Sequence, residues 1–169
     1  MATENTYNRI LKLRAVRVFR DEQLSDADLD AIIEAARWTG SSKNNQNWKF
    51  IVIRDPEQKA RLVEAGSFMT PVKNAPCVVA LVDLSEGYEF DIGRAAQNIM
   101  LAAEAIGVAS CPVTLHNDAA AAEILGLPEG VRARYAVALG YPTGETPAKR
   151  KFGTGGRKPR EEVVSYETY

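Results

Sequence analysis

The chain has 169 residues, the usual length of one domain, and its 46% apolar and 25% charged residues are typical of a globular protein rather than a disordered one. Its net charge of -1 gives no overall attraction to nucleic acid or to an anionic membrane, and no stretch approaches the roughly 18 apolar residues of a membrane span. We therefore expect a cytoplasmic protein with a single domain over residues 1–169.

Apolar residues at helical spacing predict five helices along the chain. They are expected from Asn5 to about Arg14, from Ser25 to about Thr39, from Pro56 to at least Val63, from Phe90 to Ile106 and from Asn117 to Gly126. Strands are expected at residues 48–53, 77–83 and 135–140, with a further short strand at 161–166. Because helices and strands do not alternate strictly, this order favours an α+β fold or a mixed three-layer sheet.

The sequence lacks the residue patterns of several common kinds of site, namely disulfide frameworks, metal sites, catalytic nucleophiles and nucleotide-binding loops. Cys77 and Cys111 are far apart, which argues against a disulfide framework, and the only histidine, His116, has no metal-ligand partners at suitable spacing. We interpret His116 as a structural residue before a helix cap. No nucleophile elbow is present, and the glycines at 153–156 do not follow the strand-to-helix turn of a nucleotide-binding loop. An enzyme with so few reactive side chains would depend on a bound cofactor.

The first of three segments that fit a flavin is RAVRVF, residues 14–19. Arg14 and Arg17 could both point at one anion from an extended stretch, because arginine suits bidentate contacts to phosphate. Taken alone, the same residues are better explained as a solvated basic face.

The second segment is the polar loop at residues 39–48, between a predicted helix and a predicted strand. Its asparagine and glutamine side chains carry a donor and an acceptor on one planar amide, which complements the pyrimidine edge of a flavin. An ordinary polar connection is the alternative interpretation.

The third segment is GGRKPR, residues 155–160. Glycines let backbone N–H groups approach a phosphate, and the cations that follow neutralise it. By itself this stretch could be a flexible basic tail or a weak nucleic-acid patch. One bound phosphate would explain why both ends of a nearly neutral chain are basic, and we favour that interpretation.

Taken in order, these segments resemble the FMN-dependent nitroreductase family from about Arg14 to the end of the chain. RAVRVF is similar to the family's Arg-Arg-Ser-x-Arg-x-Phe start, and TGSSKNNQNWKF is similar to its Ala-Pro-Ser-x-x-Asn-x-Gln-Pro-Trp loop. DIGRAAQNIMLAAEAIGVAS resembles the long helix that ends in Gly-x-Gly-Ser, and LGYP with GRKPREEV resembles the closing pattern. The resemblance implies a nitroreductase-like α+β fold, with three α-β-α layers around a mixed, mainly antiparallel sheet.

The resemblance also implies which residues hold FMN. The two N-terminal arginines would bind the phosphate and the ring edge, and the serine and amides of the polar loop would line the flavin, partly from the other subunit. Residues 112–114 would pass beside the isoalloxazine, with a backbone N–H or the threonine hydroxyl directed at N5, and the C-terminal cations would close over the phosphate. The residues assigned in this way are Arg14, Ala15, Arg17, Ser41, Asn44, Gln46, Pro112, Val113, Thr114, Arg157 and Lys158.

The chain departs from the family pattern at three positions and in length. Ala15 replaces the family's serine, which removes one hydrogen bond to the phosphate or ribityl chain, and Gly40 and Asn47 stand where prolines are common. At 169 residues the chain also lacks room for the insertions that usually shape the substrate pocket. The resemblance therefore supports FMN binding more strongly than any particular reaction.

Four functional hypotheses follow. The first is an NAD(P)H-dependent oxidoreductase that passes hydride through flavin N5 to a nitroaromatic, quinone or similar small-molecule acceptor, without a catalytic protein side chain. The second is a non-catalytic protein that sequesters FMN or senses redox state. The third is the flavin-destroying or dehalogenating chemistry of relatives of the family, for which the extra lid residues are missing. The fourth is a nucleic-acid module that uses the basic ends.

An obligate homodimer is expected from two features of the chain. The small residues of the helix at 91–106 permit close approach of a partner, and exposure of Ile92, Ile99 and Met100 would leave an apolar patch. The alternative is that this helix is buried within its own subunit. The segment from about 145 to 169 ends in alternating apolar residues, which fits an extended arm laid on a partner.

Overall fold

A four-stranded sheet forms the centre of the fold, with the strands in the order β1-β2-β4-β3. The strands are β1 (Trp48–Ile53), β2 (Cys77–Asp83), β3 (Ala109–Thr114) and β4 (Arg132–Gly140). All three pairings are antiparallel, and Val79 of β2 lies opposite Val52 of β1 and Val137 of β4. The computed structural model describes residues 5–84, 87–144 and 157–169.

The central strand β2 explains why both faces of the sheet are covered. Its residues 77–82 are all buried, and successive side chains of a strand point to opposite faces. The even-numbered residues of this run lie in one hydrophobic core and the odd-numbered residues lie in the other. A strand that is apolar on both faces needs a helical layer on each.

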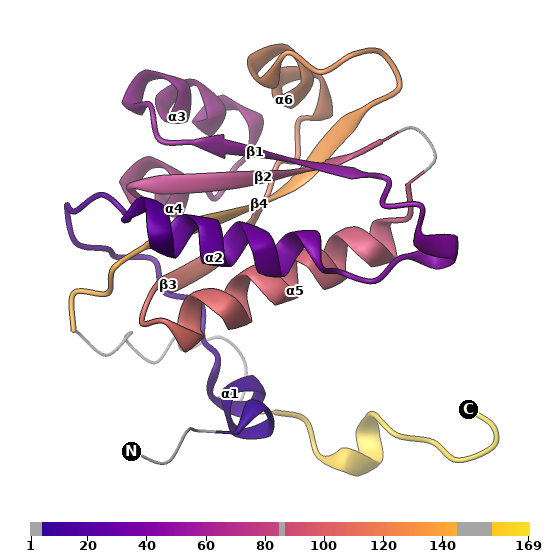
Figure 1. Cartoon of the computed structure of the whole chain (residues 1–169). Coiled ribbons are helices and arrows are strands. Elements are labelled where there is room, and N and C mark those ends of the chain that lie inside the picture. Colours follow the sequence, from indigo (N-terminus) through magenta and orange to yellow (C-terminus); the bar gives the residue numbers. More distant parts are fainter. Residues whose placement is uncertain (1–4, 85–86, 145–156) are drawn as a thin grey trace.

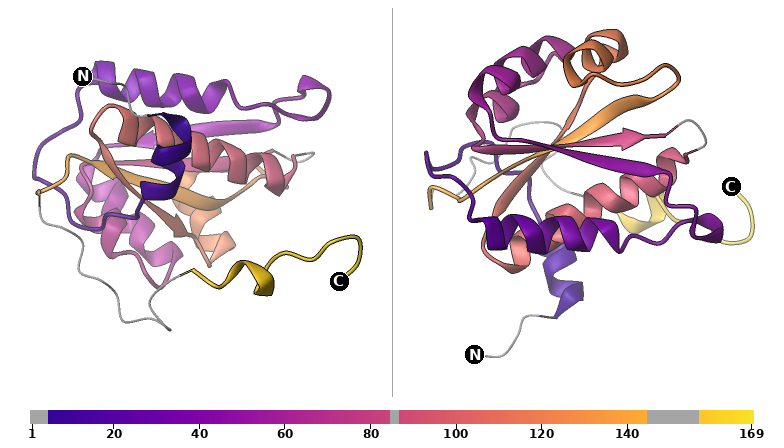
Figure 2. Two further views of the ribbon diagram at one scale, coloured as in Figure 1. Left: turned by 90° about the horizontal axis from the view of Figure 1, so that it is seen from below. Right: turned by 45° about the horizontal axis from the view of Figure 1, so that its top comes forward.

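The helices supply these two layers (Figures 1 and 2). α2 (Asp26–Arg37) and α5 (Glu89–Ala105) pack side by side on one face of the sheet. The other face is covered by α3 (Pro56–Leu62), α4 (Thr70–Asn74) and α6 (Asp118–Leu125). The expected three-layer α-β-α fold is therefore confirmed, with a sheet that contains only antiparallel pairs among the described residues.

Three short helices of the described residues lie outside these layers, namely α1 (Thr6–Lys12) and the single turns η1 (Ser42–Asn44) and η3 (Arg160–Glu162). The turn η2 (Val63–Ala65) follows α3 directly and belongs to its layer, because Ala65 is buried in the core on that face. No helix in the described ranges is long and apolar enough to cross a membrane.

Capping bonds account for the helix starts that the sequence predicts. Ser25 Oγ accepts a hydrogen bond from the Asp28 N–H at 3.1 Å, and Asp55 Oδ1 accepts one from the Gln58 N–H at 2.7 Å. Asn117 begins α6 in the same way. These bonds satisfy backbone donors that have no partner within the helix, so they fix the first turn.

Two elements have no counterpart in the sequence-based prediction, and one predicted element is wrong. α4 is too short to show a helical period, and β3 contains Pro112, which lacks the N–H that a central strand needs. The proline is tolerated because β3 is an edge strand. The strand predicted at 161–166 does not form, since residues 160–162 make the turn η3.

The expected apolar patch on the long helix is also wrong for two of its three residues. Ile92 is 2% exposed and Ile99 is 0% exposed, because both pack with α2 and the sheet in their own chain. Met100 is half-buried against the same core. This face of α5 is therefore buried within one chain, and a partner would have to bind elsewhere.

A buried lysine joins the two helices α3 and α4. Lys59 is 7% exposed, and its Nζ donates to the C=O of Ala75 at 2.6 Å and of Pro76 at 3.3 Å. We expect Lys59→Met to lower the free energy of unfolding by roughly 1.5–3 kcal/mol, because both buried carbonyls lose a charged donor. Urea unfolding measures this change.

The matched control for this prediction is Lys73→Met, at an exposed lysine in the last turn of α4. It should change the free energy of unfolding by no more than about 0.5 kcal/mol. Equal effects of the two substitutions would show that Lys59 is not part of the support for α4.

Candidate functional site

The outer edge of β3 carries backbone groups that do not pair with β4. Leu115, just beyond the strand, donates its N–H to the Arg134 C=O of β4 at 2.8 Å. In an antiparallel strand, the backbone N–H and C=O groups of every second residue point toward the same neighbouring strand. The backbone groups of every second residue from Ser110 to Thr114 therefore face away from β4. At one end of this edge the Ser110 C=O accepts from the Val16 N–H at 2.8 Å. At the other end Thr114 directs its N–H outward.

A cavity of about 300 Å³ lies along this edge. Its walls come from β3 and a residue just after it, from the segment that leads into α4 and the first turn of α4, and from one arginine of the N-terminal segment. The lining residues are Arg17, Ser67, Phe68, Thr70, Pro71, Cys111, Pro112, Val113, Thr114 and His116. The cavity thus combines one guanidinium, one imidazole and several hydroxyl groups with apolar surface.

Close packing holds the wall before α4 against the end of β3. A Cβ at Gly66 would lie 2.9 Å from the Thr114 backbone oxygen and 2.6 Å from Met69 Sδ, so a glycine is needed for this approach. The Asn117 N–H also donates to the Ala65 C=O at 2.9 Å.

Arg17 reaches the cavity because its segment is attached to the sheet on both sides. Val16 bonds to β3, and Phe19 forms an isolated bridge with Pro142 just after β4. Phe19 is buried, whereas Arg17 is half-buried. The expected extended stretch is therefore held beside the edge of β3.

Arg14 lies apart from Arg17. Its guanidinium donates to the C=O groups of Leu11 and Leu13, both at 2.8 Å, at the end of α1. It lines a second cavity, of about 310 Å³, between this segment and the end of α5. Ala15 is half-buried between the two arginines, and its C=O accepts from Arg17 at 3.3 Å. The two arginines thus line different cavities within one chain.

The loop with Ser41, Asn44 and Gln46 is tightly folded on itself. The Gln46 N–H donates to Ser41 Oγ at 3.0 Å, and Gln46 Nε2 donates to the Asn44 C=O at 3.3 Å. Lys43, Asn44 and Gln46 have φ angles of 51°, 57° and 53°, in the left-handed region. Each such residue costs on the order of 1–3 kcal/mol, and this strain is typical of functional loops.

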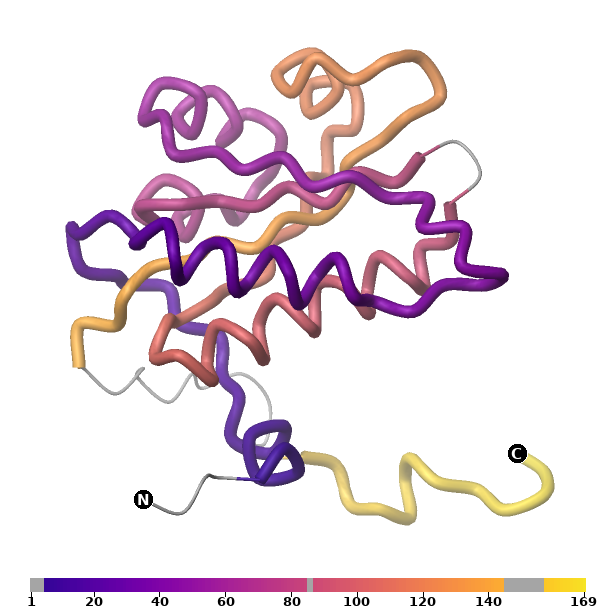
Figure 3. Tube along the Cα trace, viewed as in Figure 1, coloured from indigo at the N-terminus to yellow at the C-terminus, as the bar shows by residue number. Residues whose placement is uncertain are grey.

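The loop lies at the opposite end of α5 from the N-terminal segment (Figures 1 and 3). Arg94, early in α5, donates to the Gly40 C=O at 2.6 Å, whereas Glu104, near the end of α5, pairs with Arg9 at 2.6 Å. Ten helical residues, or about 15 Å, separate these two anchors. No residue of the loop lines the cavity at β3, so one chain does not bring the loop and Arg17 together.

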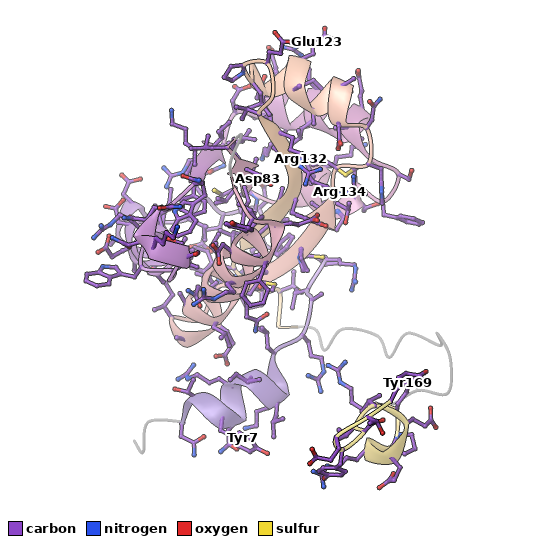
Figure 4. The ribbon with its side chains drawn as sticks, turned by 90° about the vertical axis from the view of Figure 1, so that its right-hand side faces the viewer. Tyr7, Asp83, Glu123, Arg132, Arg134 and Tyr169 are labelled. Atoms are coloured by element: carbon purple, nitrogen blue, oxygen red, sulfur yellow. The ribbon has the colours of Figure 1, made fainter. Side chains whose placement is uncertain are left out.

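Arg157 and Lys158 lie in the described C-terminal segment, residues 157–169, every residue of which is exposed. Figure 4 shows Tyr169 of this segment, and Tyr7 of α1, away from the sheet. Lys158 forms an exposed ion pair with Glu162 at 3.8 Å. Neither cation lines the cavity at β3. The rest of the expected arm, residues 145–156, lies outside the described residues.

Asp83, at the end of β2, has a carboxyl group with a raised pKa. Burial raises the pKa of Asp83, although Arg132 Nε lies 3.7 Å from its carboxylate (Figure 4). Asp83 does not line the cavity, so we assign it no part in the site. The described part of the chain also contains no cluster of three or more His, Cys, Asp or Glu residues that could hold a metal ion.

Sequence reasoning missed one wall of the cavity. Its residues are Ser67, Phe68, Thr70, Pro71 and His116. The segment before α4 carries no motif, and only the tertiary contact at Gly66 places it beside β3. His116 offered a signal, as the only histidine, but the structural interpretation overlooked that its exposed side chain lines the cavity.

Comparison with known proteins identifies the family. A protein of Archaeoglobus fulgidus, provisionally named an NADH dehydrogenase/NAD(P)H nitroreductase, is 35% identical over 84% of this chain and 88% of its own length. An FMN reductase (NADPH) of Bacillus subtilis is 28% identical over 98% of this chain and 74% of its own length. The fold matches an FMN-dependent nitroreductase of Clostridium difficile with a TM-score of 0.82, at 23% identity over 97% of this chain and all of that one. The sequence pattern of the Nitroreductase family matches residues 10–86 and 72–141, so this chain belongs to the nitroreductase family.

Proposed function

We propose that this protein is an NAD(P)H-dependent flavin oxidoreductase that binds FMN along the outer edge of β3 and reduces a nitroaromatic, quinone or similar acceptor. Family membership and the names of the relatives support this class of enzyme. The observation that carries the proposal is the outward-facing N–H of Thr114 beside a cavity that also contains Arg17.

The residues present fit FMN by their chemistry. A flavin needs a flat apolar wall, a hydrogen-bond donor at the reactive edge of the ring and a positive charge for its phosphate. Pro112 is exposed and has no N–H, which leaves the Thr114 N–H as the backbone donor on that stretch of the edge. Arg17 supplies the charge, in the fork geometry that matches phosphate.

Bound FMN would supply the redox chemistry, by accepting hydride from NAD(P)H at N5 and passing it to the acceptor. The task of the chain is to bind and orient. Pro112 and Val113 would form the wall beside the ring, and the Thr114 N–H or hydroxyl would donate a hydrogen bond toward N5. Arg17 would hold positive charge near the phosphate and the ring edge. No protein nucleophile is required.

The protein would act as a homodimer with two equivalent sites. Ser41, Asn44 and Gln46 would reach the cavity of a second copy, because their own chain holds them at the other end of α5. Arg157 and Lys158 would close over the phosphate from the exposed C-terminal segment. The exposed apolar side chains of this segment also favour a partner that covers them, since such groups are rarely left in water together.

The purified protein is expected to be yellow or to bind added FMN, and anaerobic NADH or NADPH should bleach the flavin absorption. With a quinone or nitroaromatic acceptor, double-reciprocal plots of the steady-state rates should give parallel lines, as expected for a ping-pong mechanism with two alternating half-reactions. A flavin that stays oxidised with both nucleotides would favour the non-catalytic FMN-binding alternative. Failure to bind FMN would overturn the proposal itself.

A further inference from the structure

Phe68 lies on one wall of the cavity at β3, and the proposed flavin contacts do not involve this wall. Its ring is 82% exposed, yet the chain is fixed on both sides of it, by Gly66 against Thr114 and by the buried side chain of Met69. An aromatic ring held out from an anchored segment offers a flat face to a ligand in the cavity.

His116 is fixed in a similar way at the end of β3. The preceding residue, Leu115, is buried and donates to the Arg134 C=O at 2.8 Å, and the following residue, Asn117, donates to the Ala65 C=O at 2.9 Å. The exposed imidazole between them lines the same cavity as Phe68. A histidine in this position can donate an N–H to a ligand in the cavity.

The charges around the cavity have one sign. Arg17 and His116 are its basic groups, and no Asp or Glu is present among the described residues that line it. The hydroxyl groups of Ser67 and Thr70 add further donors. Because Arg17 would be paired with the phosphate of FMN, His116 is the basic group left for a second ligand, and with the hydroxyl groups it suits one that carries oxygen acceptors or negative charge.

We propose that Phe68 and His116 form an acceptor subsite that selects flat aromatic acceptors bearing a negative group. The aromatic ring of the acceptor packs against Phe68, and its anionic group receives a hydrogen bond from His116. This inference rests on the proposed function, because it names the class of acceptor that the flavin site would reduce.

The test uses three nitroaromatic probes of similar size and different charge, namely para-nitrobenzoate, para-nitrobenzyl alcohol and para-nitrobenzylammonium. Because the chain has a single histidine, its imidazole NMR signals belong to His116. Titration of the FMN-loaded protein with para-nitrobenzoate should shift these signals. Binding should be about tenfold tighter than for the alcohol, as expected for one charge-assisted contact, and the ammonium probe should bind most weakly.

Variants separate the two residues. His116→Leu removes the N–H donor, so the preference for para-nitrobenzoate over the alcohol should fall from about tenfold toward equality. Phe68→Leu should weaken the binding of para-nitrobenzoate and of the alcohol by similar factors. Phe68→Tyr, which keeps a flat ring, should bind both compounds as tightly as the native protein does. Lys73→Gln removes an exposed cation outside the cavity lining and should leave the preference unchanged. Perturbation of the flavin absorption by the probe gives affinities for the variants.

The subsite and the proposed function can fail separately. Equal binding of the three probes, or imidazole signals that do not respond to para-nitrobenzoate, would overturn the subsite even if all three compounds were reduced. Shifted imidazole signals together with a flavin that NADH and NADPH cannot reduce would support the subsite and contradict the proposed enzyme.

Discussion

Replacing Arg17 by alanine is expected to weaken FMN binding about 10- to 100-fold, because a charge-assisted hydrogen bond contributes roughly 1.5–3 kcal/mol. The guanidinium lines the cavity at β3 and has one internal contact, to the Ala15 C=O at 3.3 Å, among the bonds of the described residues. Arg157→Ala should have a similar effect if its exposed cation closes over the same phosphate. Fluorescence titration of the apoprotein with FMN measures both losses.

Two controls make this prediction specific. Riboflavin lacks the phosphate, so it should bind poorly to the native protein and respond little to either substitution. Arg14→Ala is the matched arginine variant, and its effect should be smaller because that guanidinium is engaged by the Leu11 and Leu13 carbonyls at the end of α1. Equal losses for FMN and riboflavin would mean that these arginines do not hold the phosphate.

The layers of this fold could be predicted from local sequence patterns, because the decisive signals are local. The continuous apolar run at 77–83 forms the central strand, and Ser25, Asp55 and Asn117 cap the helices whose apolar spacing follows them. A run that is apolar at every position requires cover on both faces. Local periodicity and capping were sufficient for these elements.

The edge strand β3 could not be predicted from local pattern. Pro112 argues against a strand unless the strand is known to lie at an edge, and only the strand order β1-β2-β4-β3 places it there. The edge position matters for the site. Because the Leu115 N–H points toward β4, the N–H of the preceding residue, Thr114, points away from β4, on the side of the cavity.

The site was predictable only in part for the same physical reason. The motif residues Arg17 and Pro112 to Thr114 line one cavity, but Phe68 and His116 join them through tertiary contacts that no sequence motif predicts. The polar loop was identified from its amides, whereas its distance from Arg17 depends on the length of α5. The local sequence therefore identifies the loop but does not give its position relative to Arg17, which depends on the tertiary structure.

Subunit complementation provides the sharpest test of the proposed dimer. In the proposed arrangement, each flavin site takes Arg17 from one chain and the loop with Gln46 from the other. We expect FMN binding to be weakened in the Arg17→Ala homodimer and in the Gln46→Gly homodimer. Glycine is chosen because Gln46 has a φ of 53°, so the substitution removes the amide without straining the loop.

A heterodimer of the two variants should regain one native site. Its first site combines the intact Arg17 of one chain with the intact loop of the other, and its second site carries both substitutions. Purification through two different tags, followed by FMN titration, should therefore reveal native affinity in half of the sites. If each site were built within one chain, every site would carry one substitution, and no native affinity would return. That outcome would remove Ser41, Asn44 and Gln46 from the partner's site, because it would show that the loop acts on its own subunit or not at all.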